Sequence, residues 1–133
     1  ILTVASIVEK EAANDEERPI IASIIYNRLN QNMMLQMDST VHYGLALEGR
    51  GEEKLSLDLV QNFDSPYNCY RVAGLPAGPI CNPGMASIQA ALNPAATNYL
   101  FMALDRETET HRFFIYSEEH AEFVSTQDYG QTQ

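Results

Sequence analysis

The sequence predicts an α+β fold, a mostly helical domain with one small antiparallel sheet near the C-terminus. Apolar side chains recur at helical spacing through most of the first 29 residues. Two segments rich in aromatic and branched residues, 99–105 and 112–117, follow each other late in the chain, as the strands of a hairpin do. The length of 133 residues and the 45% hydrophobic content are typical of one globular domain, so we expect a single domain over residues 1–133.

Two helices are predicted at the start of the chain, over residues 1–13 and 19–29. The apolar positions of the first are Ile1, Val4, Ala5, Val8 and Ala12. Asn14 and Asp15 interrupt this pattern. Pro19 then suits the first turn of a new helix, where the backbone N–H that proline lacks has no helical partner. The pattern therefore indicates two helices that meet at an acidic joint.

Two shorter helices are predicted in the middle of the chain. Asp38 or Ser39 is expected to cap a helix that runs through Tyr43 and ends at Gly44. The segment SLDLVQNF is interpreted as a second helix, capped by Ser56.

The rest of the chain alternates irregular and regular segments. Residues 64–84 are too rich in proline and glycine for regular structure, and a loop of this length in a compact domain usually has a function. We then expect a helix over residues 85–93 ended by Pro94, the two strands joined at 106–111, and a last helix over 118–129 capped by Ser117. The polar residues 125–133 are expected to fray.

The net charge of −10 argues against two classes of partner. Nucleic acids and anionic lipid surfaces are bound through clustered basic residues, and this chain has only two lysines, Lys10 and Lys54. A glycan remains compatible, since it is recognised by hydrogen bonds and aromatic faces. No apolar run reaches the roughly 20 residues that span a bilayer, and the sequence begins at Ile1 inside a helical pattern. We therefore expect an excised domain, with any anchor or targeting segment upstream.

The two cysteines, Cys69 and Cys81, allow three interpretations: buried thiols, a disulfide, or half of a metal site. A metal site is disfavoured, because no second cysteine pair exists and His42, His111 and His120 show no ligand spacing. Thiols and a disulfide both stay open. A disulfide here would contribute about 3 kcal/mol in the chain-entropy model.

Glu9 and Glu11 are the candidate functional residues of the first helix. On a helical wheel they flank the apolar stripe on opposite edges, and charges at such edges are usually just solvated. The residues three and four positions away are Ala5, Ser6, Ala12 and Ala13 for Glu9, but Ile7, Val8, Asn14 and Asp15 for Glu11. Small neighbours leave room for a ligand beside Glu9, and partial burial there would raise its pKa, as a general acid requires. Glu11 is expected to be structural or to support the catalytic group from behind.

Several ordered segments of the chain resemble the catalytic domain of the endolytic murein transglycosylases, the YceG-like or MltG family. They are ASIVEKEA, ERPIIASIIYNRL, MLQMDSTVHYGL, SPYNCYRVAGLPAGPICNPGMASIQAALNP and YLFMAL. The similarity covers nearly all of residues 3–124. The sequence departs from the family pattern at two positions. Cys69 stands where threonine is more common, and Ser39 replaces a common proline.

This resemblance implies an activity and a location. The activity is cofactor-free lytic cleavage of the β-1,4 bond between N-acetylmuramic acid and N-acetylglucosamine, with a 1,6-anhydro product. The location is a catalytic domain that faces the cell wall, tethered to the cell membrane by a single N-terminal helix and preceded by a LysM-like segment, neither of which is expected within residues 1–133. Expected partners are peptidoglycan strands and cell-wall synthesis proteins, with membrane contact only through the anchor.

The resemblance also implies the catalytic residue. The family's catalytic glutamate lies in the SIVEKE motif, whose first glutamate is Glu9. Ordinary glycosidases use two carboxylates. In a lytic reaction the muramic C6 hydroxyl attacks its own anomeric carbon, so one carboxyl suffices. It protonates the glycosidic oxygen and then accepts the hydroxyl proton.

Other positions in the family motifs are expected to bind the glycan, although each also has a structural interpretation. They are Gln36, Asp38, Thr40, Tyr43, Tyr67, Asn68 and Tyr70. The polar side chains either bind sugar hydroxyl and acetamido groups or serve turns and caps. The tyrosines either pack on sugar rings or are buried. His111 is favoured as a loop residue over a groove contact.

The sequence allows two other functions and argues against a third. Hydrolysis by water, as in a muramidase, needs a second carboxylate, for which Asp38 and Asp64 are candidates. A wall-glycan-binding module would keep the fold without turnover. Pyridoxal-phosphate chemistry needs a Schiff-base lysine in a pocket, but Lys10 faces solvent on the wheel and Lys54 lies in a charged loop, so this function is excluded.

Overall fold

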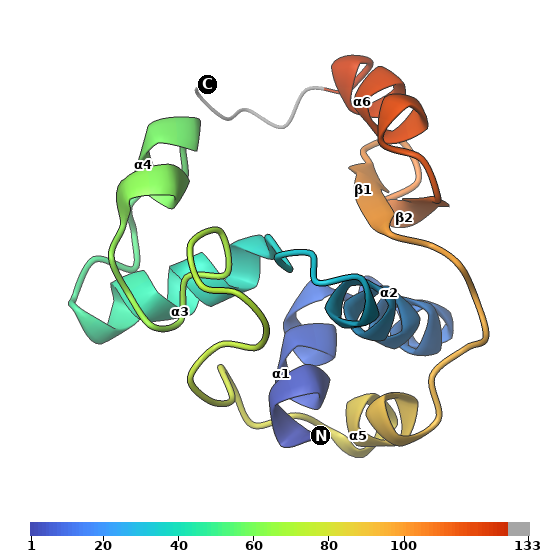
Figure 1. The fold of residues 1–133 in the computed structure, drawn as a ribbon, viewed down its shortest axis with the longest axis horizontal. Coiled ribbons are helices and arrows are strands. Elements are labelled where there is room, and N and C mark those ends of the chain that lie inside the picture. Colours follow the sequence, from blue (N-terminus) through green and yellow to red (C-terminus); the bar gives the residue numbers. More distant parts are fainter. Residues whose placement is uncertain (128–133) are drawn as a thin grey trace.

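The structure is a computed structural model that describes residues 1–127. Figure 1 shows its elements in chain order, and the predicted α+β class with a small sheet near the C-terminus is confirmed. The elements are α1 (Leu2–Glu11), η1 (Asp15–Glu17), α2 (Arg18–Asn30), α3 (Asp38–Leu47), α4 (Leu57–Asn62), α5 (Met85–Leu92), β1 (Phe101–Asp105), β2 (Thr110–Phe114) and α6 (Ser117–Ser125). The predicted end of the last helix at residue 129 and most of the predicted frayed tail lie outside the described residues.

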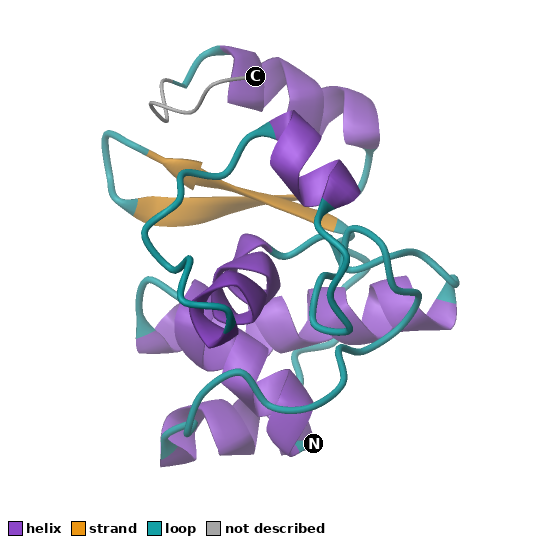
Figure 2. Ribbon diagram, turned by 90° about the vertical axis from the view of Figure 1, so that its left-hand side faces the viewer, coloured by secondary structure: helices purple, strands orange, loops and turns teal. Residues whose placement is uncertain are grey.

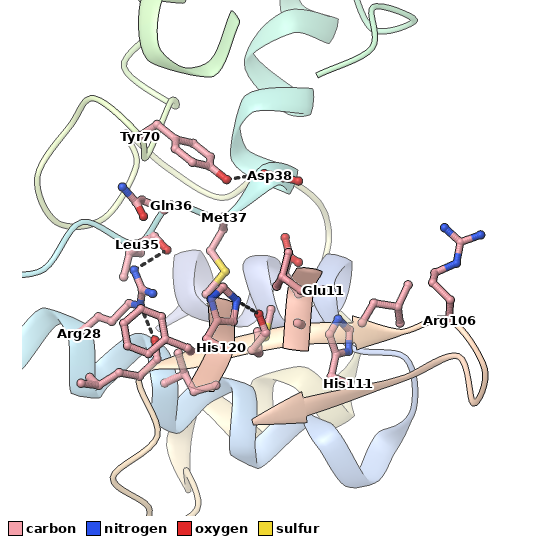
Figure 3. Close-up of a pocket in the computed structure, with 17 residues that line it drawn as sticks. Glu11, Arg28, Leu35, Gln36, Met37, Asp38, Tyr70, Arg106, His111 and His120 are labelled. Atoms are coloured by element: carbon pink, nitrogen blue, oxygen red, sulfur yellow. Dashed lines mark hydrogen bonds between the residues drawn. The ribbon is translucent and has the colours of Figure 1, made fainter. Parts of the chain in front are cut away.

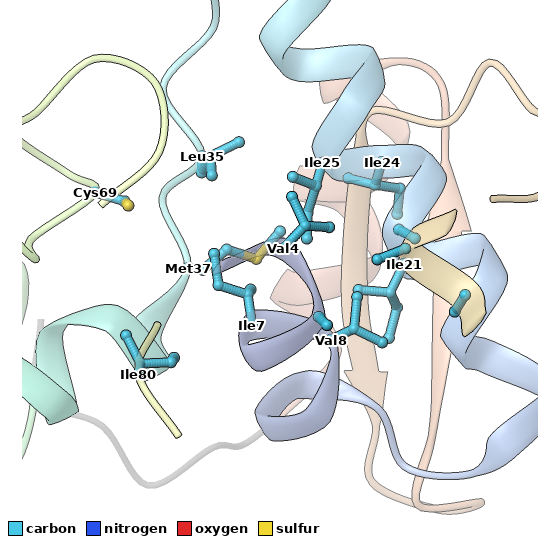
Figure 4. Close-up of a cluster of buried hydrophobic side chains, with 14 residues drawn as sticks. Val4, Ile7, Val8, Ile21, Ile24, Ile25, Leu35, Met37, Cys69 and Ile80 are labelled. Atoms are coloured by element: carbon cyan, nitrogen blue, oxygen red, sulfur yellow. The ribbon is translucent and has the colours of Figure 1, made fainter. Parts of the chain in front are cut away.

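The main hydrophobic core lies where α1, α2 and α5 pack together (Figure 4). The five consecutive residues 4–8 of α1 are all buried, so the middle of this helix is enclosed on most sides. The polar member of this run, Ser6, is satisfied: its hydroxyl donates to Thr3 O at 2.7 Å and accepts from Ile80 N at 3.0 Å. Because α1 is enclosed rather than half-exposed, an apolar stripe with two edges describes it poorly.

A second, smaller core lies beneath α3 and α4. The prediction that α3 ends at Gly44 is wrong, because the helix continues to Leu47. Gly44 is required there by packing: a Cβ atom would lie 2.9 Å from Ser65 Oγ and 3.0 Å from the Phe63 ring.

The predicted helix caps have mixed outcomes. Ser56 caps α4, since its side chain accepts a hydrogen bond from Leu59 N. The predicted cap of α3 is wrong: its N-cap residue is Met37, which makes no side-chain cap bond. The predicted cap of α6 is also wrong, because Ser117 lies inside the helix and Tyr116 precedes it.

The late hairpin forms a separate layer. β1 and β2 pair antiparallel with Leu104 opposite His111, so β2 begins and ends earlier than the predicted strand 112–117. Figures 1 and 2 show the two strands between α6 and the group formed by α1, α2 and α5. The ring of Phe114 in β2 packs against Phe123 of α6, with centroids 5.7 Å apart.

The end of α2 ties this layer to the helical body. The guanidinium of Arg28 donates to Leu100 O at 2.6 Å and to Met34 O at 2.8 Å. The amide of Asn27 donates to Thr97 O and Tyr99 O, both at 2.9 Å. Within residues 1–127, none of the helices combines the length and apolarity that a bilayer crossing requires.

Candidate active site

A pocket of about 690 Å³ lies between the helical body and the hairpin layer (Figure 3). Its wall comes from the end of α1, from α2, from residues 35–38, from Tyr70, from both strands and from α6. The volume lies within the roughly 300–1,000 Å³ typical of small-ligand sites. Segments from both ends of the sequence therefore meet around one cavity.

Glu11 is the carboxyl group of α1 that lines this pocket. It is the last residue of the helix, and its Oε2 accepts a hydrogen bond from Ser39 N at 3.2 Å. Burial is the main cause that raises its pKa, and the negative charge of Asp38 adds to the effect. Hydrogen bonds from Ser39 and the charge of His111 oppose the rise without cancelling it. A carboxyl group that retains its proton above the ordinary range is what a general acid requires.

Glu9 does not line the pocket. Its Oε1 accepts hydrogen bonds from Gly84 N and Ser87 Oγ, both at 2.9 Å, and Arg18 Nη1 lies 3.7 Å away. The Gly84 bond and then the Ser87 bond lower the pKa of Glu9, aided by the charge of Arg18 and outweighing burial. The prediction that partial burial raises this pKa is therefore wrong.

The small residues beside Glu9 have a structural explanation. Ala90 and Ala91 of α5 belong to the same buried cluster as Ala5 of α1, with Ala12 packed against it. Thus α5 packs in the space that these small side chains leave open beside α1. Glu9 caps the N-terminus of that helix as an anion, where the helix dipole favours negative charge.

Three of the seven predicted glycan-binding residues lie in the pocket with Glu11: Gln36, Asp38 and Tyr70 (Figure 3). The Tyr70 hydroxyl donates to Asp38 Oδ1 at 2.6 Å. Burial and then the charge of Asp38 raise the pKa of Tyr70, so the phenol stays a donor. Gln36 has a φ of 52°, in the left-handed region that non-glycine residues rarely adopt.

Two other predicted glycan-binding residues are fully buried instead. The Thr40 hydroxyl donates to Met37 O at 2.7 Å and accepts from Cys69 N at 3.2 Å. The Asn68 amide donates to Val60 O at 2.9 Å and Phe63 O at 2.8 Å, and its carbonyl accepts from Tyr70 N at 2.9 Å. Because every strong contact of these side chains is internal, they shape the loop rather than the pocket.

The remaining predicted aromatic contacts also lie outside the pocket wall. Tyr43 and Tyr67 pack edge to face, with ring centroids 4.9 Å apart, against the main core. Asp64, a candidate second carboxylate, is exposed and does not line the pocket, whereas Asp38 does.

Sequence reasoning missed the basic side chains of the pocket. Arg28 is only 8% exposed, and its guanidinium lies 5.0 Å from the Phe101 ring centroid. An arginine within the isoleucine-rich face of α2 was the available signal. His111 lies on β2 and lines the pocket, so its interpretation as a loop residue was wrong. His120 of α6 also lines the pocket, with Nε2 3.0 Å from Met102 O.

The two cysteines are free thiols in the structure, Cys69 buried and Cys81 half-buried. The disulfide alternative is therefore not realised, and burial raises the pKa of each thiol. Within residues 1–127, no group of three or more His, Cys, Asp and Glu side chains converges as a metal site does.

The raised pKa of Glu11 predicts a pH-dependent cost to stability. In the pH window between the ordinary value of 4.5 and the raised pKa, the folded state binds more protons than the unfolded chain, so stability falls as pH rises. Glu11→Gln removes this ionisation and keeps an oxygen for Ser39 N. We expect the variant to be more stable than the parent at neutral pH, with the difference shrinking toward pH 4.5, as measured by urea denaturation across this range. A variant less stable at neutral pH would contradict a half-buried Glu11 whose ionisation is disfavoured.

Fold and site together define a class: an α+β domain with a carboxylate-lined pocket suited to acid–base chemistry on a polar ligand. Within that class the family is clear. Residues 1–126 match the model of the YceG-like family, and the chain belongs to that family, which confirms the resemblance predicted from the sequence.

Named relatives agree with this membership. The chain is 47% identical over 102 residues to an endolytic murein transglycosylase of Bacillus subtilis, covering 76% of this chain and 27% of that protein. A Streptococcus pneumoniae protein of the same name is 38% identical over 108 residues, covering 79% and 19%. A crystal structure of a YceG-like protein from Listeria monocytogenes superposes with a TM-score of 0.82 at 42% identity, covering 91% of this chain and 38% of that one. The chain thus spans about a quarter or less of the length of the two named relatives.

Proposed function

We propose that this domain cleaves peptidoglycan glycan strands by lytic transglycosylation, with Glu11 as the proton donor. One observation carries the proposal: the only glutamate of the EKE motif that lines the pocket is also the one whose pKa is raised. The names of the relatives supply the substrate class. Because Glu9 is bound by α5 as an anion, Glu11 replaces it as the catalytic candidate.

The reaction needs only one carboxyl group of the protein and the C6 hydroxyl of the substrate. The proton of Glu11 passes to the glycosidic oxygen as the bond between that oxygen and muramic C1 breaks. The C6 hydroxyl oxygen bonds to C1 and closes the 1,6-anhydro ring. In the scheme with a single catalytic residue, the Glu11 carboxylate then accepts the hydroxyl proton, which restores the acid. General acid catalysis of this kind contributes about 10²–10⁴-fold in rate.

The pocket wall supports a sugar ligand. Asp38, Tyr70 and Gln36 offer acceptors and donors for hydroxyl and acetamido groups. Phe101 and Met102 of β1 form an apolar part of the same wall, against which a sugar ring packs. The site thus combines a proton donor with both kinds of contact that carbohydrate recognition needs.

Hydrolysis is the second candidate function, because Asp38 lies in the same pocket as Glu11. It is a second carboxylate, as water-activating glycosidases require. A binding module without turnover is the remaining alternative.

The product distinguishes these functions. We expect purified sacculi digested with the protein to yield muropeptides ending in an anhydro sugar, lighter by one water molecule than hydrolysed ends in mass spectrometry. Hydrated ends alone would assign the protein as a muramidase. Glycan binding without either product would indicate a binding module, provided that the same preparation is folded.

The cellular setting follows from the same proposal. Since the chain spans 27% of the Bacillus relative, we propose that it is the catalytic part of a longer protein anchored in the cell membrane, with this domain facing the cell wall. Cell-wall synthesis proteins are the expected neighbours. Locating an epitope-tagged full-length protein by membrane fractionation and protease accessibility tests this arrangement.

A further inference from the structure

A buried carboxylate and a histidine form a pair at the edge of the pocket. His111 Nδ1 lies 2.7 Å from Glu17 Oε1, and His111 N donates to Glu17 Oε2 at 2.7 Å. Ala13 N donates to Glu17 Oε1 at 3.0 Å. The side chains of Glu17 and His111 are only 6% and 11% exposed, so solvent scarcely competes for these contacts.

These contacts decide which ring nitrogen of His111 carries the proton. Burial raises the pKa of Glu17, but the bonds from His111 N, Ala13 N and the His111 ring outweigh it and lower the pKa overall. An ionised carboxylate only accepts hydrogen bonds, so Nδ1 is the donor. In the neutral ring the lone pair then lies on Nε2, as in other carboxylate–histidine pairs.

The ring of His111 faces the proposed chemistry. His111 and Glu11 line the same pocket, His111 from β2 and Glu11 from α1 (Figure 3). They are close enough for the charge of His111 to act on Glu11. The Nδ1 side of the ring is held by Glu17, and no described residue forms a hydrogen bond or ion pair with Nε2. The structure thus leaves a basic nitrogen available in the pocket that Glu11 also lines.

We propose that His111, oriented by Glu17, accepts the proton of the attacking C6 hydroxyl. This rests on the proposed function and divides its two proton transfers between two residues. In a hexopyranose of the D series, C6 lies on the same face of the ring as a β-linked leaving oxygen. The base must therefore lie on the same side of the sugar as the acid, and His111 lines the same pocket as Glu11. One oxygen of Glu11 is already engaged by Ser39 N, which favours a second group for this step.

Both catalytic groups regain their starting protonation states after one turnover. Glu11 gives its proton to the leaving oxygen, the bond from C1 to that oxygen breaks, and the bond from C1 to O6 forms. The proton of O6 passes to Nε2, and the imidazolium is stabilised by the Glu17 carboxylate. Transfer from the imidazolium to the Glu11 carboxylate restores the starting state. The active state of the pair is therefore the one that holds a single proton between Glu11 and His111.

The test compares variants of the full chain. His111→Asn places an amide nitrogen near the position of Nδ1, so a bond to Glu17 is retained, but it lacks Nε2. We expect kcat to fall by about 10²-fold or more, with KM within about threefold, and the acid limb of the pH profile to disappear while the alkaline limb stays. His42→Asn is the matched control, since His42 is exposed on α3 and outside the pocket.

The other ionisable groups of the pocket are the same in the parent and in His111→Asn, so an acid limb lost in that variant depends on His111. These groups are Glu11, Asp38, Tyr70, Arg28, Arg106 and His120. Glu17 contacts His111 without lining the pocket. Asp105, in the strand paired with β2, faces Arg112 at 3.6 Å. Glu17→Gln keeps all these groups except the partner carboxylate. We expect it to lower kcat by about tenfold and to displace the proton from Nδ1, seen in nitrogen-15 spectra of the histidine ring.

The outcomes separate the two proposals. Loss of activity in Glu11→Gln together with an unchanged kcat and pH profile in His111→Asn would overturn the role of His111 alone. Full activity in Glu11→Gln would overturn the role of Glu11 as proton donor and the pocket as the active site, on which the proposed function rests. If a variant fails to fold, the ring spectrum of the parent protein decides: a neutral His111 with its proton on Nδ1 supports the inference, and a proton on Nε2 overturns it.

Discussion

Replacing Glu11 by glutamine is expected to reduce glycan cleavage by about 10²–10⁴-fold, while Glu9→Gln retains most of it. Glutamine has nearly the shape of glutamate but cannot donate a carboxyl proton. Glu11 lines the pocket and has a raised pKa, whereas Glu9 is bound to Gly84 N and Ser87 Oγ at the start of α5. The measurement is the release of anhydro-sugar ends from purified sacculi at equal concentrations of folded protein.

Each variant controls for the other, because both change one carboxylate of the same helix. Glu9→Gln is expected to affect stability instead of chemistry. It exchanges an anionic cap of α5 for a neutral one, and losses of a helix cap amount to about 0.5–2 kcal/mol. Thermal melts of both variants therefore accompany the assay. A folded Glu9→Gln variant without turnover, together with an active Glu11→Gln variant, would return the catalytic role to Glu9 and remove the pocket as the active site.

Truncating Asn68 to alanine is expected to destabilise the fold by about 2–5 kcal/mol. The side chain is fully buried, and its amide bonds Val60 O, Phe63 O and Tyr70 N. Its loss leaves three backbone groups without their hydrogen-bond partners. Each buried unsatisfied group costs about 1–3 kcal/mol before partial relaxation. Tyr70 would also lose its support, so the contact between its hydroxyl and Asp38 is expected to loosen. Urea denaturation measures the change in the free energy of unfolding.

Asn62→Ala provides the comparison for Asn68→Ala. Asn62 is exposed on α4 and bonds only Asp58, so its truncation is expected to change stability by less than about 0.5 kcal/mol. An Asn68→Ala variant with parental stability but weakened glycan binding would instead support the sequence-based prediction that Asn68 contacts the sugar.

Local patterns predicted the elements well because helices and strands are encoded at short range. The helical spacing before residue 30, Pro19 in the first turn of α2 and the Ser56 cap of α4 each depend on neighbours a few residues away. The failures involve partners far along the chain. Gly44 continues α3 because Phe63 and Ser65 occupy the space beside it. The first turn of α3 receives a hydrogen-bond acceptor from Glu11 instead of a cap of its own.

The sequence by itself determined the fold class, the family and the EKE motif as the place to look for a catalytic carboxyl. Only the tertiary structure decided between its two glutamates. Glu9 and Glu11 are two positions apart on one helix, so local spacing treats them almost alike. Their pKa values diverge because Glu9 meets the N-terminus of α5 across 75 positions of sequence, while Glu11 is desolvated in a pocket closed by the hairpin and α6. Solvation and charge depend on what surrounds a group in space, and chain folding alone brings those surroundings together.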